Sequence, residues 1–85
     1  MQFEWDAAKS AEVKATRGAS FEELAEAAEH GGFLGLEENP LHPSQRLLIV
    51  RFEGEIWAVP IERRGSNVRF VTAYRSRKWR KKYGT

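Results

Sequence analysis

The sequence predicts an α+β fold in which two N-terminal helices are followed by an antiparallel sheet and a short basic helix. Apolar residues recur at helical spacing within residues 6–32, and they alternate with polar residues over much of 46–75. The third observation is a basic run, because six of the eight residues in 75–82 are arginine or lysine. Since the chain has no repeat and no long linker, we expect residues 1–85 to form one domain with a small core.

The first part of the chain carries the two predicted helices. A short strand leads to a helix that begins after Asp6 and ends at Gly18. Its apolar face is mostly alanine, so it depends on packing against the rest of the protein. Ser20 and Glu23 form a capping box for the second helix, because the hydroxyl accepts a hydrogen bond from one free amide and the carboxylate accepts one from another. Glycines 31–32 end that helix.

Three to four antiparallel strands are predicted next. Residues 33–36 form the first, and a proline-containing loop leads to a hairpin whose turn lies at Glu53 and Gly54. Pro60 has no amide proton, so the return strand is expected to be an edge strand or to bulge there. The alternation in 68–75 predicts one further strand, and we expect the helices to cover one face of the sheet.

Charge is separated along the chain, although the formal net charge is only +2. Residues 1–62 hold five basic and twelve acidic residues, whereas residues 63–85 hold nine basic residues and no acid. Such a surface attracts phosphate polymers, although a solvated basic face is the simpler alternative. The absence of cysteine excludes thiolate metal sites, and no apolar run is long enough to span a membrane. We therefore expect a cytoplasmic protein with no metal, no cofactor and no membrane partner.

Arginine side chains near the C-terminus form the main candidate site. Arg69 and Arg75 should share one strand face, because six residues are three strand repeats. Ser76 should cap the last helix, on which Arg77 and Lys81 are neighbours at i,i+4. A guanidinium group can donate two hydrogen bonds to one phosphate, so we expect Arg75 and Arg77 to stabilise phosphate charge. The other candidate RNA-binding residues are Lys9, Arg17, Arg46, Arg69, Lys78, Arg80 and Lys81.

A ribonuclease that uses no metal needs a base for the 2′-hydroxyl, a proton donor for the leaving oxygen, and cations for the phosphorane. Clustered arginines supply the cations. Tyr83 and His42 are the candidates for proton transfer, and Glu62 is a further possible base. Trp79 lies at i,i+4 from Tyr83 and is better explained by docking of the last helix on the sheet.

Two long stretches, FEWDAAKSAEVKATRGASFEELAEA and VRFVTAYRSRKWRKKY, resemble the N-terminal signature and the closing strand and helix of the BrnT family of bacterial type II toxins. The matching positions are Phe3, Trp5, Asp6, Lys9, Arg17, Gly18, Ser20, Phe21, Glu22, Glu23, Arg75, Arg77 and Tyr83. The resemblance implies a RelE-like fold, a metal-independent endoribonuclease that arrests translation, and a small ribbon-helix-helix antitoxin as partner. Many family members have histidine where Arg17 stands. Because an arginine stays protonated near neutral pH, Arg17 cannot replace a histidine that transfers protons.

Two other functions are compatible with the same basic C-terminal face. A non-catalytic RNA-binding module would use it to hold phosphates, and its affinity would fall steeply with salt. A protein-interaction module would use it to bind an acidic partner. Cleavage of RNA by the isolated protein separates the first function from these two.

Overall fold

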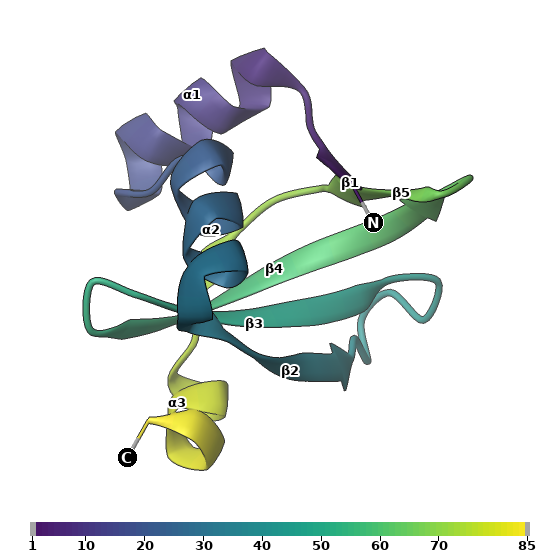
Figure 1. The fold of residues 1–85 in the computed structure, drawn as a ribbon. Helices are drawn as coiled ribbons and strands as arrows, with labels where there is room; N and C mark the ends of the chain where they lie inside the picture. Colours follow the sequence, from purple (N-terminus) through teal and green to yellow (C-terminus); the bar gives the residue numbers. More distant parts are fainter. Residues whose placement is uncertain (1, 85) are drawn as a thin grey trace.

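The computed structural model describes residues 2–84 and contains a six-stranded sheet with helices on both of its faces (Figure 1). In chain order the elements are β1 (Gln2–Glu4), α1 (Ala7–Arg17), α2 (Phe21–Ala27), the helical turn η1 (Ala28–Gly32), β2 (Phe33–Glu38), β3 (Arg46–Phe52), β4 (Glu55–Arg64), β5 (Asn67–Phe70), β6 (Tyr74–Arg75) and α3 (Arg77–Tyr83). The predicted α+β class and the order of the helices are confirmed. Within the described residues no helix is long and apolar enough to cross a membrane.

The predicted capping residues lie at the ends of both N-terminal helices. The Asp6 carboxylate accepts a backbone hydrogen bond at 2.9 Å at the start of α1, and Gly18 ends this helix in the left-handed conformation with φ of 102°. Ser20 and Glu23 make both hydrogen bonds of the capping box of α2. The end of α2 widens into η1, where Gly31 adopts a φ of 99° and the chain turns towards β2.

The sheet is mixed, whereas the sequence predicted three to four antiparallel strands. Its strand order is β1-β5-β4-β3-β2, and β6 also pairs with β4. The pairs that involve β2, β3, β4 and β6 are antiparallel, as is the pair of β4 with β5. β1 pairs in parallel with β5 over only three positions. The parallel pairing was not predicted, because a strand of three residues is too short for an alternation of apolar and polar side chains that would indicate its partner strand.

The predicted last strand is divided into β5 and β6, which corrects the expected relation between Arg69 and Arg75. Arg69 lies opposite Glu62 of β4, and Arg75 lies opposite Trp57 of the same strand. These positions of β4 are an odd number of residues apart, so the two arginines lie on opposite faces of the sheet. The side-chain alternation suggested one strand because it continues through residues 71–73, where the pairing stops.

Pro60 lies in an inner strand, so the first of the two predicted alternatives, an edge strand, is wrong. The second alternative, a bulge, agrees with an irregularity beside Pro60, where residues 71–73 lie against residues 59–60 of β4. β4 pairs with β3 on one side and with β5 and β6 on the other. The break between β5 and β6 falls beside Pro60, whose carbonyl accepts a hydrogen bond from the amide of Val71 at 2.9 Å. The missing proline donor therefore faces an interruption in the neighbouring strand, where the ladder does not require it.

Helices cover both faces of the sheet, which corrects the expectation of one covered face (Figure 1). Under α1 and α2 lies the main core, which includes Phe21, Trp57 and Phe70. The other face of β3 and β4 is also apolar, and it forms a smaller cluster against which Trp79 and Tyr83 of α3 pack. A sheet with two apolar faces needs cover on both. The predicted docking of Trp79 on the sheet is confirmed.

Candidate nucleic-acid interface

Three arginines line a hollow of about 280 Å³ between the β3–β4 turn and α3, which we call the basic hollow. Arg75 comes from β6, whereas Arg77 and Arg80 come from α3. Gly54 and Glu55 contribute from the turn and the start of β4. The structure therefore brings together Arg75 and Arg77, as expected from the sequence, and adds Arg80 to them.

Local sequence explains how α3 presents its arginines. The hydroxyl of Ser76 accepts a hydrogen bond from the Trp79 amide at 3.2 Å, so α3 begins directly after β6. Trp79 packs against the sheet and fixes the rotation of the helix. Arg77 and Arg80 are three residues apart, and this spacing places both on the side of α3 that faces the turn.

The basic hollow adjoins a second depression of about 260 Å³, and the two share the lining residues Gly54, Ile56 and Arg80. Arg51 of β3 lines this depression, and its guanidinium group donates a hydrogen bond at 2.7 Å to the carbonyl of Tyr83. Arginine side chains from β3, β6 and α3 thus line two adjoining hollows beside the turn.

Arg75 is held in place by contacts with three parts of the protein. Its Nε donates to the Glu55 carboxylate at 2.6 Å, and its guanidinium group lies 4.9 Å from the centre of the Trp57 ring. Arg75 also donates to the Arg17 carbonyl at 2.8 Å, while the Arg17 guanidinium donates to the Ala73 carbonyl at 2.9 Å. These reciprocal bonds join the C-terminal end of α1, where carbonyls lack helical partners, to the segment before β6. Arg17 therefore makes a structural contact with that segment.

Arg77 and Arg80 make no such contacts. Among residues 2–84, side-chain hydrogen bonds from arginine come from Arg17, Arg51, Arg69 and Arg75. Arg77 and Arg80 are exposed, and neither belongs to an ion pair of the described residues. Their guanidinium groups are therefore available to a phosphate.

Tyr83 lies outside the basic hollow. Its hydroxyl donates to the Glu37 carboxylate on β2, and Lys82 donates to the same carboxylate at 2.7 Å. The hydrogen bond to Glu37 raises the pKa of Tyr83, and the hydrogen bonds from Lys82 and then Tyr83 lower the pKa of Glu37. Gly35 makes the approach possible, because a Cβ there would lie 2.6 Å from the tyrosine hydroxyl. Tyr83 does not line the basic hollow, and its predicted role in proton transfer stays a prediction.

His42 and Glu62, the other predicted proton-transfer candidates, lie at the far end of the sheet. His42 is exposed in the loop that precedes β3, whereas the basic hollow lies beside the turn that follows β3. Glu62 accepts a hydrogen bond from Gln45 at 3.0 Å, at the same far end. Neither His42 nor Glu62 lines the basic hollow.

The predicted RNA-binding residues are divided among several surfaces. Lys9 pairs with Glu12 on α1 at 3.3 Å, and Arg69 pairs with Glu4 at 3.4 Å. On α3, Lys78 lies 4.8 Å from the Trp79 ring and Lys81 is exposed near the arginines of the hollow. Arg46 lines a different hollow together with Leu48 and Ile61, at the end of β3 away from the β3–β4 turn. Only the residues of α3 accompany Arg75 and Arg77.

Sequence reasoning missed Glu55 and Arg51. Glu55 is the only carboxylate that lines the basic hollow among the described residues, and it touches Arg75. Its position directly after the predicted turn was a signal that it would lie at a sheet end. No local signal showed that α3 would lie beside that turn, because this contact depends on the docking of α3.

Comparisons of the chain with models of known protein families and with curated proteins find no match. The resemblance to BrnT toxins therefore stays a prediction. The chemistry of the basic hollow follows from its own residues, which are cations with free donors and one carboxylate held at 2.6 Å from a guanidinium nitrogen.

Proposed function

We propose that the protein is a cytoplasmic type II toxin with a RelE-like fold, and that it cuts RNA as a metal-independent endoribonuclease. The observation that carries the proposal is the convergence of Arg75, Arg77 and Arg80 with the carboxylate of Glu55 in one hollow. The acid-free sequence after residue 62 and the resemblance to BrnT toxins support it. A ribbon-helix-helix antitoxin would be the neutralising partner.

In this proposal the four charged residues of the hollow perform three roles. Arg77 and Arg80 bind the phosphate that is cut and stabilise its growing negative charge. Glu55 takes the proton from the 2′-hydroxyl, whose oxygen attacks the phosphorus while the bond to the 5′-oxygen breaks. Water protonates the leaving oxygen. Arg75 positions Glu55 through the hydrogen bond at 2.6 Å.

The test is cleavage of a labelled single-stranded RNA by the purified protein. Arg77→Ala combined with Arg80→Ala should slow cleavage at least about a hundredfold, because both charge-stabilising donors are lost. Glu55→Gln should slow it about a hundredfold or more, because the proton acceptor is lost. Arg64→Ala, which removes an exposed arginine outside the hollow, is the matched control and should cleave like the wild type. Wild-type protein that is folded and leaves RNA intact would sink the enzymatic proposal.

A non-catalytic RNA-binding module is the second candidate. It is favoured by the positions of Tyr83 and His42, which lie outside the basic hollow. In that case the wild type should retain RNA on a filter at low salt, release it steeply as salt rises, and leave it uncut. The variant without Arg77 and Arg80 should lose retention in either case, so cleavage is the measurement that separates the two functions.

A further inference from the structure

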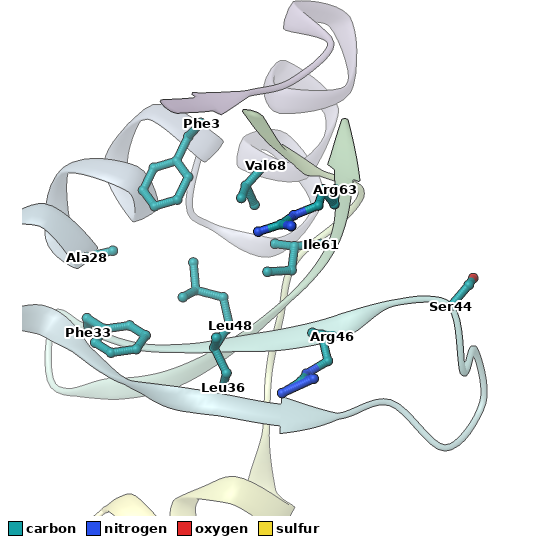
Figure 2. A pocket seen from close by; sticks show the side chains of 10 residues that line it. All are labelled: Phe3, Ala28, Phe33, Leu36, Ser44, Arg46, Leu48, Ile61, Arg63 and Val68. Carbon is teal, nitrogen blue, oxygen red and sulfur yellow. The ribbon is translucent and has the colours of Figure 1, made fainter. Parts of the chain in front are cut away.

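A hollow lies on the face of the sheet that α1 and α2 cover only in part, and we call it the apolar groove (Figure 2). Its volume is about 510 Å³. It crosses the sheet, because its lining residues come from both edge strands and from the strands between them. The apolar ones include Phe3, Phe33, Leu36, Leu48, Ile61 and Val68.

The apolar groove continues the main core beyond the edge of the helical layer. Leu48 and Val68 are only 4% and 6% exposed, whereas Phe33 is 50% and Leu36 is 48% exposed. Phe3 lines the groove and also packs against the core beneath α1 and α2. A contiguous patch of half-exposed apolar side chains is typical of a surface that binds a protein, a membrane or a ligand.

The position of the groove suits a helix. α2 crosses the strands of the sheet, and the groove begins at Ala28, directly after α2 (Figures 1 and 2). A helix laid beside α2 at the usual separation of about 8–10 Å would cover the exposed side chains of Phe33 and Leu36. The helical layer on this face would then extend across the whole sheet.

Two arginines define the charge that the occupant must carry. Arg46 lies opposite Ile61, and Arg63 lies two residues after Ile61, so both side chains are on the groove face. Neither arginine makes a side-chain hydrogen bond or ion pair with another residue in 2–84. Glu38 of β2 lies opposite Arg46, but it forms no ion pair with this arginine in residues 2–84. Two neighbouring cations that form no ion pair favour an occupant that brings carboxylates.

We infer that the apolar groove binds an amphipathic helix of a partner protein, with apolar side chains over Phe33 and Leu36 and carboxylates paired with Arg46 and Arg63. A nucleic acid has no continuous apolar face for such a surface. Within residues 2–84 a second copy of this chain offers no suitable helix, because the buried apolar side chains of α1 and α2 belong to its own core and α3 is basic. The inference stands apart from the ribonuclease proposal, since the groove and α3 are on opposite faces of the sheet (Figure 1).

The test uses two fluorescein-labelled helical peptides in an anisotropy titration. Both carry leucine at i, i+3, i+4 and i+7; one has glutamates beside this stripe, and the other has lysines at those positions. The glutamate peptide should bind the wild type more tightly than the lysine peptide. Leu36→Glu should weaken its binding about tenfold, because a charge enters the apolar contact. Arg46→Glu combined with Arg63→Glu should reverse the preference, so that the lysine peptide binds more tightly.

Two control variants change surface residues outside the groove. Leu41→Glu alters a leucine that is 83% exposed outside the groove, and Arg64→Glu alters the next residue after Arg63, on the other face of β4. Both should bind the glutamate peptide like the wild type, and circular dichroism should show that every variant is folded.

Four results would overturn the inference. Equal affinity for the two peptides removes the role of the arginines, and unchanged binding by Leu36→Glu removes the role of the groove. A dimer in light scattering that Leu36→Glu dissociates would make a second copy the occupant. Sedimentation with phosphatidylglycerol vesicles that is lost in the variant lacking Arg46 and Arg63 would make the occupant a lipid surface.

Discussion

The two faces of the sheet hold their helices by different kinds of contact. On the first face Phe21 and Leu24 of α2 are fully buried, and the Phe21 ring lies 5.7 Å from that of Phe70. On the second face α3 has no buried residue; it rests on the half-buried Trp79 and Tyr83 and on polar contacts with β2 and β3. Apolar burial stabilises more than exposed polar contacts do. The free arginines of the basic hollow therefore belong to the helix that is less firmly held.

Removal of a core side chain on the first face should have the largest effect. Phe21→Ala leaves a cavity beneath α2 and should lower the free energy of unfolding by about 3–5 kcal/mol in urea denaturation. Phe33→Ala removes the same ring from a site that is 50% exposed, and its loss should be much smaller. Equal losses would show that the first face does not depend on deep burial.

Trp79→Ala should have an intermediate effect that is confined to the second face. The indole is half-buried against the sheet, so its loss should cost about 1–2 kcal/mol and leave α3 loosely held. Hydrogen exchange should accelerate for the amides of α3, while those of β3 and β4 keep their protection. Equal acceleration throughout the sheet would show that the two faces unfold as one unit, which breaks the comparison.

Substitution of Arg75 and of Arg77 should have different effects on the free energy of unfolding, because within residues 2–84 only Arg75 of the two makes hydrogen bonds with its side chain. Arg75→Ala leaves the Arg17 carbonyl without its donor and should cost about 1 kcal/mol in urea denaturation. Arg77→Ala should change the free energy of unfolding by no more than about 0.5 kcal/mol, because its side chain makes no hydrogen bond within the described residues. An equally large loss in Arg77→Ala would contradict this difference.

The smallest effect should be a pH dependence at Glu37. Its lowered pKa means that its contribution is present above its unfolded pKa, about 4.5, and is lost as pH falls through the folded value. The raised pKa values of Lys82 and Tyr83 mean that their contributions are lost as pH rises through the folded values. Glu37→Gln should therefore be less stable than the wild type near neutral pH, and this difference should shrink towards acid and alkaline pH. Glu38→Gln, at an exposed neighbour that makes no side-chain hydrogen bond within residues 2–84, is the control, and its free energy of unfolding near neutral pH should match that of the wild type.

The sequence predicted those parts of the fold that depend on local contacts. Asp6, Gly18 and Ser20 mark helix ends because each acts on amides or carbonyls within one turn. The hairpin was predicted for the same reason. The division of the last strand was not, because the break beside Pro60 depends on a strand that is distant in sequence. The opposite placement of α3 was missed because a pattern of alternation shows that a strand has two faces but not which helix covers each.

The candidate site was predicted only within α3 and β6. Helical spacing grouped Arg77 with its neighbours, and closeness along the chain added Arg75. Glu55 and Arg75 are 20 residues apart in the sequence, and Glu37 and Tyr83 are 46 apart. Residue spacing within one helix or strand therefore could not predict either contact. The apolar groove was missed because its walls come from residues near the N-terminus, from β2 and from the later strands.

The parallel edge of the sheet has a consequence for the order of folding events. Gln2 pairs with Asn67, and the side chain of Asn67 donates to Glu4 at 2.9 Å, so this edge closes most of the chain into one loop. The β3–β4 hairpin closes through a short turn at Glu53 and Gly54. Closing the long loop costs more entropy, so we expect the hairpin to form first and β1 to join late. The contacts of β1 would then lower the rate of unfolding and have little influence on the rate of folding.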